Sequence, residues 1–157
     1  MDERNYTKIA DYIRSNSLAI VGTTDDDGAP YGAVVYVCND SHRPIVYFIT
    51  KEGTRKYRNL TARPTVSLTI VNPQESSTLQ AKGQASLVHD AATLDMITTK
   101  ITRTQASAPE WLPPISKLHA GEYVMVAIEL TEARLAEYKG KMIGEAGIFT
   151  EVGTELS

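Results

Sequence analysis

Residues 45–56, IVYFITKEGTRK, say most about how this 157-residue chain folds. The first six are rich in β-branched and aromatic residues, which is typical of a strand. The last residues place two cations, Arg55 and Lys56, in the first turn of a helix predicted over Thr54 to Ala62. We therefore expect a strand that leads through a glycine-containing turn directly into a basic helix.

Further strands are predicted on both sides of this segment, because β-branched runs alternate with turn signals. Asp25 to Gly28 has the composition of a hairpin turn, and Asn72 to Ser77 that of a loop. Gly83 lies inside a strand pattern, which indicates a bulge or a close backbone approach. The predicted strands cover residues 18–24, 31–38, 45–50, 65–71, 78–88 and 123–130.

The spacing of apolar residues predicts two more helices. An amphipathic helix is expected over about residues 3–15, where Ile9 and Ile13 share one face. A later helix is expected to begin at Asp90, whose carboxylate can accept hydrogen bonds from free N–H groups of the first turn. The helix that follows Lys56 ends before Pro64, since the residue before a proline avoids helical angles.

Strands dominate this pattern, so the predicted fold class is mainly β, a barrel with flanking helices. Closure of the barrel would remove exposed strand edges. The whole chain, residues 1–157, is expected to form a single domain, with the barrel at about 18–130. From about residue 139 to 157 the pattern is weak, which predicts a loose tail or a partner-binding arm.

The bulk composition is that of a globular protein and excludes several classes. Sixteen Lys and Arg against nineteen Asp and Glu give a net charge of −3, which argues against a protein that coats nucleic acid or anionic membrane. No apolar stretch approaches the ~20 residues of a membrane span, and no secretion signal is recognisable. The single cysteine, Cys38, fits a reducing compartment, so a cytoplasmic location is expected.

The basic residues gather in one place. Residues 51–63 carry a local net charge of +4, so the rest of the chain carries −7. Cations at a helix N-terminus are unfavourable by about 0.3–1 kcal/mol each, and a bound anion would remove the conflict. Thr50 and Thr54 add hydroxyl donors, and Gly53 allows close approach of the backbone. The segment predicts a phosphate cradle, with a basic face exposed to water as the alternative.

The ordered set of segments resembles the pyridoxamine 5′-phosphate oxidase-like FMN-binding split barrels. The segments that carry the resemblance are residues 26–30, DDGAP; 46–50, VYFIT; 53–60, GTRKYRNL; 64–68, PTVSL; and 79–85, LQAKGQA. It covers residues 18 to about 88, and residues 123–130 fit the last barrel strand of the family. The resemblance implies a six-stranded antiparallel split barrel and a homodimer with flavin at the subunit interface.

The same resemblance implies a set of FMN-binding residues. Arg55 and Lys56 would bind the phosphate, helped by Thr50 and Thr54. The residues expected around the isoalloxazine ring are the backbone of Val34, Val35 and Tyr36, the side chain of Ile49, and Thr78 and Gln80 of the fifth strand. Trp111 would close the pocket from the partner subunit, with a packing role as the alternative.

Two departures separate this chain from pyridoxamine 5′-phosphate oxidase proper. Ala33 stands where that enzyme has an arginine, and no basic, aromatic segment is found after Leu130. Vitamin B6 oxidase activity is therefore not expected. Arg63 also departs from the family, which often has asparagine before the proline.

Three function classes follow. The first is an FMN-dependent oxidoreductase with an unknown substrate, since flavin chemistry needs no essential acid or base from the protein. The second is a non-catalytic module that stores, buffers or senses flavin, or holds a deazaflavin or haem instead. The third is a barrel whose basic segment binds another anionic nucleotide or a nucleic acid, which the overall acidity disfavours.

Two other kinds of chemistry are considered from the residue types. A nucleophilic Cys38 with His42 nearby is a candidate, but a lone strand cysteine is more often a small hydrophobic residue. The histidines lie on separate elements, so no metal site is expected.

Overall fold

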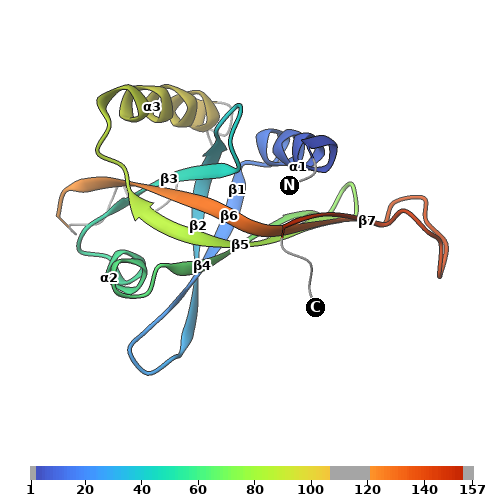
Figure 1. Cartoon of the computed structure of the whole chain (residues 1–157), viewed down its shortest axis with the longest axis horizontal. Helices are drawn as coiled ribbons and strands as arrows, with labels where there is room; N and C mark the ends of the chain where they lie inside the picture. The colour runs from blue at the N-terminus through green and yellow to red at the C-terminus, as the bar shows by residue number, and fades with distance from the viewer. Residues whose placement is uncertain (1–2, 107–120, 154–157) are drawn as a thin grey trace.

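A computed structural model describes residues 3–106 and 121–153 (Figure 1). The elements are α1 (Glu3–Ser15), β1 (Leu18–Thr24), β2 (Pro30–Asn39), β3 (Ile45–Lys51), α2 (Arg55–Ala62), β4 (Thr65–Asn72), β5 (Ser77–Leu87), α3 (Ala91–Ala106), β6 (Tyr123–Glu137) and β7 (Phe149–Gly153).

The strands form one antiparallel sheet in the order β3-β2-β1-β4-β5-β6-β7. A further pairing between β3 and β6 joins the two ends of the first six strands, from Ile45↔Glu129 to Lys51↔Tyr123. This pairing closes a six-stranded barrel, and β7 extends the sheet beyond it. The mainly β, barrel-type fold predicted from the sequence is confirmed.

The barrel is split between β2 and β3. Their ladder covers only Val37–Asn39 and Val46–Phe48, whereas β1 and β2 pair along seven residues of β1. Along residues 30–36, β2 is therefore paired with β1 but not with β3. One edge of β2 is left out of the sheet hydrogen bonding next to the end of β3 that leads into α2.

Two apolar clusters hold the helices against the barrel. Inside it, side chains such as Val21 and Phe48 pack with Ile9 and Ile13 of α1, all of them almost fully buried. Outside it, α3 covers a second cluster that contains Tyr47 and Cys38. Figure 1 shows α1 and α3 on one side of the barrel and α2 on the opposite side. The site described below therefore lies away from α3.

The turn after β1 and the N-cap of α3 form at the residues predicted from the sequence. The carboxylate of Asp25 accepts hydrogen bonds from the N–H groups of Asp27 (3.0 Å) and Ala29 (2.9 Å) in the β1–β2 turn. Gly28 has a φ of 81° there, a conformation that costs other residues energy. The carboxylate of Asp90 accepts from the N–H of Thr93 at 2.8 Å, so Asp90 caps α3 as predicted.

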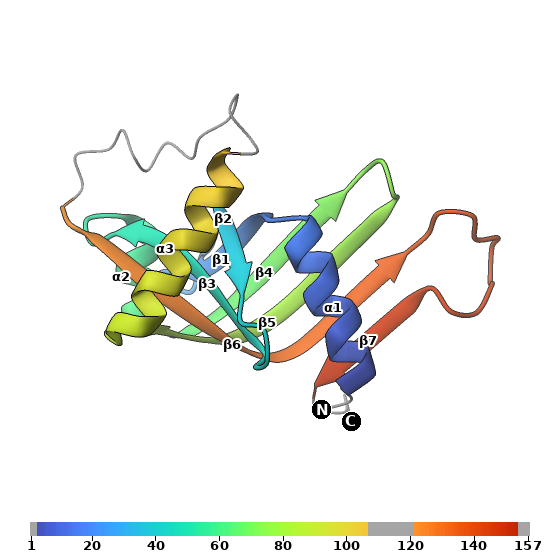
Figure 2. The same ribbon diagram turned by 90° about the horizontal axis from the view of Figure 1, so that it is seen from above.

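The C-terminal part of the sheet was only partly predicted. The last barrel strand was expected to end at Leu130, but β6 continues to Glu137 and pairs with β7. Its second half alternates small or apolar inward residues, such as Ala133, with charged outward ones, which is a weak strand pattern. Figure 2 shows the β6–β7 hairpin projecting from the body, where only a tail was expected. That expected tail thus contains a strand.

Gly83 marks a shift in register between β5 and β6. A Cβ atom at this position would lie 2.4 Å from the carbonyl oxygen of Glu129 and 2.6 Å from a methyl group of Ile128. The close backbone approach predicted from the sequence is thus confirmed, and it leaves no room for a side chain.

We expect Gly83→Ala to lower the free energy of unfolding by about 1–3 kcal/mol, because the added methyl group must displace backbone atoms. Urea unfolding at equilibrium measures the change. Ser86→Ala, at an exposed position on the same strand, is the control and should stay within about 0.5 kcal/mol of the parent. Equal stability of the two variants would contradict the packing described at the bulge.

Candidate functional site

Two threonines fix the start of α2. The Thr54 hydroxyl donates to the carbonyl of Lys51 at 2.7 Å and accepts the N–H of Tyr57 at 3.4 Å, so Thr54 is the N-cap. The hydroxyl oxygens of Thr50 and Thr54 lie 3.1 Å apart, and both side chains are buried. Since the Thr54 proton is used, Thr50 donates to Thr54, and both protons are taken up within the protein.

These contacts give both hydroxyls a structural role at the start of the helix. Their predicted help in phosphate binding stays a prediction. A ligand would have to displace one of these bonds to receive a proton from either threonine.

The first turn of α2 is cationic and has no acidic residue. Within residues 3–106 and 121–153, Arg55, Lys56 and Arg58 form no ion pair with a carboxylate. The same described residues supply no acceptor for the backbone N–H of Arg55 or Lys56. Two orphan donors and three uncompensated charges therefore meet at one helix end, the arrangement that binds anions in proteins.

The pKa of Lys56 reflects the unfavourable electrostatics at the start of α2. Its side chain is half-buried, and burial lowers the pKa of its ammonium group from the ordinary value. Desolvation of a cation without a counter-charge disfavours its charged form. A bound anion would offset this effect.

One face of α2 is directed at the β1–β2 hairpin. Arg55, Asn59 and Arg63 follow one another at intervals of four, so they share a helix face. The guanidinium carbon of Arg55 lies 4.2 Å from the ring centroid of Tyr31. The buried amide of Asn59 donates to the hydroxyl of Thr23 at 3.1 Å.

Arg63 completes this contact at the other end of α2. Its Nε donates to the carbonyl of Thr24 at 2.6 Å, and its Nη1 lies 3.0 Å from a carboxylate oxygen of Asp26. Arg63, which departs from the family pattern, thus fixes the end of α2 to the β1–β2 hairpin, and we refer to these contacts as the Arg63 clamp. Sequence reasoning missed Tyr31, Asn59 and this role of Arg63, although the four-residue spacing was the available signal.

The residues predicted to surround the ring lie where β2 and β3 separate. The ladder begins at Val37↔Phe48, so Tyr36 and Ile49 are the first residues outside it. Val35 is buried in the barrel core, so only its backbone could contact a ligand. Val34 is 41% exposed on the outer face. The structure thus brings these residues together near the start of α2.

Thr78 and Gln80 lie elsewhere on the same outer face. The register runs from Val34 through Ile20 and Thr69 to Gln80, which is three strand spacings, or about 14 Å. Within one chain these two residues are therefore separated from the β2–β3 split. Their predicted approach to the ring stays a prediction and would require a second copy.

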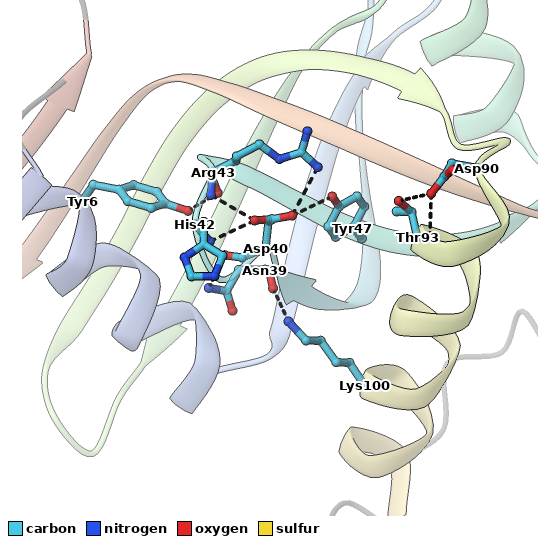
Figure 3. Close-up of polar contacts among 9 residues, drawn as sticks. All are labelled: Tyr6, Asn39, Asp40, His42, Arg43, Tyr47, Asp90, Thr93 and Lys100. Atoms are coloured by element: carbon cyan, nitrogen blue, oxygen red, sulfur yellow. Dashed lines mark hydrogen bonds and ion pairs between the residues drawn. The ribbon is translucent and has the colours of Figure 1, made fainter.

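A second polar cluster surrounds Asp40 in the turn between β2 and β3 (Figure 3). Its carboxylate accepts from the backbone N–H of His42 (2.9 Å) and Arg43 (3.0 Å), from the Arg43 guanidinium (3.3 Å) and from the Tyr47 hydroxyl (3.2 Å). Burial would raise the pKa of Asp40, but these hydrogen bonds outweigh it and lower the pKa. Every polar atom of the carboxylate is engaged, so the cluster holds the turn and leaves no site for a ligand.

We expect Asp40→Asn to make the free energy of unfolding depend less on pH under acidic conditions. The pKa of Asp40 is lower in the folded protein than in the unfolded chain, so its contribution is complete above about pH 4 and is lost as the pH falls through the folded value. Urea unfolding between pH 3 and pH 7 measures this.

Asp11→Asn, at an exposed carboxylate that pairs with Arg14, serves as the control and should keep the parental pH dependence. If Asp40→Asn also kept it, the hydrogen bonds to the carboxylate would not contribute to stability.

Cys38 is buried under α3 and not exposed to a substrate. Burial raises the pKa of its thiol to about 11, and nearby Lys100 lowers it only in part. His42 is exposed in the turn. These positions argue against the nucleophile considered for this pair.

We expect Cys38 to resist a thiol reagent such as a chromogenic aromatic disulfide in the folded protein at pH 8. A pKa of about 11 leaves about one thiol in a thousand ionised, and the side chain is covered. Absorbance of the released thiolate, with and without denaturant, measures the rate. Equal rates in both conditions would show that α3 does not shield the cysteine.

Residues 3–106 and 121–153 contain no cluster of three or more His, Cys, Asp or Glu side chains that could hold a metal ion. Over the same ranges, no helix combines the length and apolar character of a membrane span. Trp111 and His119 lie outside the described residues, so the predicted closure of the pocket by Trp111 stays a prediction.

This fold, a closed six-stranded barrel split beside a cationic helix start, defines a class of split barrels. A family model described as pyridoxamine 5′-phosphate oxidase matches residues 7–136. The chain belongs to this family. No curated protein matches the chain.

Solved structures share the fold at low sequence identity. A Clostridium acetobutylicum protein related to general stress protein 26 is 17% identical, with a TM-score of 0.64, 88% of this chain covered and 92% of the other. A Nostoc punctiforme FMN-binding protein is 13% identical, with a TM-score of 0.60 and coverages of 94% and 95%. A haem-binding protein from Mycobacterium smegmatis is 14% identical, with a TM-score of 0.69 and coverages of 98% and 59%.

Proposed function

We propose that this protein binds FMN and works as a flavin-dependent oxidoreductase on a substrate that is not yet identified. The observation that carries the proposal is the start of α2, where Arg55 and Lys56 combine free backbone donors with charges that no described carboxylate compensates. The FMN phosphate supplies the charge and the acceptor atoms that this helix end lacks.

The ring is proposed to lie along the split between β2 and β3. The backbone of Val34 to Tyr36 is not paired with β3, and Ile49 lies at the opposite side of the split. Backbone N–H and C=O groups suit the polar edge of an isoalloxazine ring, and apolar side chains suit its face. Ile49 precedes the start of α2 by only a few residues in the chain, so one FMN molecule could place its phosphate at the helix and its ring at the split.

A homodimer is proposed on the outer face of the sheet. Leu18, Ile20, Val34 and Val71 are each 41–60% exposed there, although large apolar residues are normally covered. A second copy on this face would cover them and would bring its own Thr78 and Gln80 towards the ring. The proposed location is the cytoplasm, where the single Cys38 would stay reduced.

When bound, FMN would supply hydride or electron transfer, and the chain would supply binding and orientation. Arg55 and Lys56 would hold the phosphate, and the β2 edge would fix the ring against the barrel. Flavin chemistry needs no essential acid or base from the protein, and we assign none to this chain. The bound flavin, together with a substrate over its exposed face, would therefore carry the chemistry.

Haem binding without catalysis is the second candidate, because one structure of the same fold is described as haem-binding. Haem iron needs an axial ligand, most often histidine. The described histidines, His42 and His89, are exposed on the turn after β2 and on the segment before α3. The cationic start of α2, which suits the phosphate of FMN, favours the flavin.

An absorbance spectrum tests the proposal. We expect the purified protein, mixed with FMN and passed over a gel filtration column, to keep flavin bands at about one flavin per chain. Reduction by NADH or NADPH under anaerobic conditions would then support the oxidoreductase assignment. A haem spectrum after the same procedure with hemin, and no retained flavin, would overturn it in favour of the second candidate.

The double variant Arg55→Ala with Lys56→Ala should bind FMN about 100-fold more weakly or worse, because two charge-assisted contacts to phosphate are removed. Its affinity for riboflavin, which lacks the phosphate, should stay within a few-fold of the parental value. Fluorescence quenching of each flavin on titration with protein measures both.

Lys139→Ala with Lys141→Ala is the matched control, since it changes the net charge equally on the distant β6–β7 hairpin. If the control weakened FMN binding as much as the α2 variant, general electrostatic attraction would replace the proposed site.

A further inference from the structure

We propose that Tyr31 is a positioning residue that holds the guanidinium of Arg55 flat against its ring, so that the edge of the guanidinium presents its N–H donors to a phosphate. This inference rests on the proposed function and adds a specificity element to it. Tyr31 belongs to none of the FMN-binding positions expected from the sequence.

The geometry of the contact supports this role. The guanidinium carbon of Arg55 lies over the Tyr31 ring, 4.2 Å from its centre, well within the range of a cation–π pair. A guanidinium is planar and carries all its N–H groups in that plane. A guanidinium that lies flat on the ring would use only one of its two faces and would leave all its N–H donors available at its edge.

The fold holds the ring in place. Tyr31 pairs directly with Thr23 across the β1–β2 hairpin, so the two side chains share a face of the sheet. Thr23 faces α2, because its hydroxyl accepts the hydrogen bond from Asn59. Tyr31 must then face α2 as well, and the Arg63 clamp on Thr24 fixes the hairpin at the other end of the helix.

The other contacts of these side chains are few. The Arg55 side chain has no carboxylate partner within the described residues, and there the Tyr31 ring has Arg55 as its one polar or aromatic contact. Tyr31 is 37% exposed, so it is not held as a core residue. A long exposed arginine side chain loses much rotamer freedom when it binds a ligand. The stacked ring removes part of that cost before the phosphate arrives.

The resulting prediction concerns the ratio of riboflavin to FMN dissociation constants, which isolates the contribution of the phosphate. In the full-length protein, Tyr31→Leu should lower this ratio about two- to fivefold, the amount expected for an exposed cation–π contact. Tyr31→Phe keeps the ring face and should restore the parental ratio. Tyr138→Leu, on the β6–β7 hairpin, is the matched control and should leave the ratio unchanged.

A second measurement tests the contact without any flavin. In the parent and in Tyr31→Phe, the side-chain NMR signals of Arg55 should be shifted upfield by the ring current, and Tyr31→Leu should abolish the shift. Urea unfolding of each variant shows whether the fold is kept.

The outcomes separate this inference from the proposed function. The parent protein could bind FMN in preference to riboflavin while Tyr31→Leu keeps the same ratio of the two dissociation constants, or while Arg55 shows no ring-current shift. Either result would overturn the role of Tyr31 but would leave the FMN site in place. Equal loss in Tyr31→Leu and Tyr31→Phe would also overturn it, because the hydroxyl would then be the active group. A parent protein that binds FMN no better than riboflavin would overturn both proposals.

Discussion

The pairing of β3 with β6 is the constraint on which the rest of the structure depends. It closes the barrel from Ile45↔Glu129 to Lys51↔Tyr123 and uses one edge of β3 along its whole length. The other edge meets β2 over only three residues, so the barrel opens into a split directly before α2. Barrel closure, the free edge of β2 and the position of the cationic helix are therefore consequences of one arrangement of strands.

The positive charge at the start of α2 then determines which ligands the split can bind. A helix of eight residues begins with Arg55 and Lys56, and no acidic residue in its first turn offsets the positive helix end. The energy that this arrangement costs is offset elsewhere by packing and by the contacts of Asn59 and Arg63 with the hairpin. A protein keeps such a local conflict where an anion resolves it, which ties the stability of the fold to the proposed binding of a phosphate.

The parts of the fold that depend on local patterns could be predicted from the sequence. The turn at Gly28, the cap at Asp90 and the bulge at Gly83 each follow from a single residue with a specific conformational or capping property. The second half of β6 and the strand β7 could not, because Ala133 and its charged neighbours have no strong strand propensity and gain their order from pairing.

Some parts of the candidate site could likewise be predicted from the sequence, and others could not. The charge cluster at Arg55 and Lys56 is visible in the sequence, because charge does not depend on tertiary structure. The stacking of Arg55 on Tyr31 is not visible, since the two residues meet only through the pairing of β1 with β2 and the packing of α2 on that hairpin. Thr50 and Thr54 show a further case, since their contacts with each other and with the helix start could not be predicted, and their help in phosphate binding stays a prediction.

The most direct test of the central claim is a crystal structure of the protein reconstituted with FMN. The account predicts phosphate oxygens within about 3 Å of the backbone N–H groups of Arg55 and Lys56, the distance of a charge-assisted hydrogen bond. A flavin bound with its phosphate away from the start of α2 would contradict it.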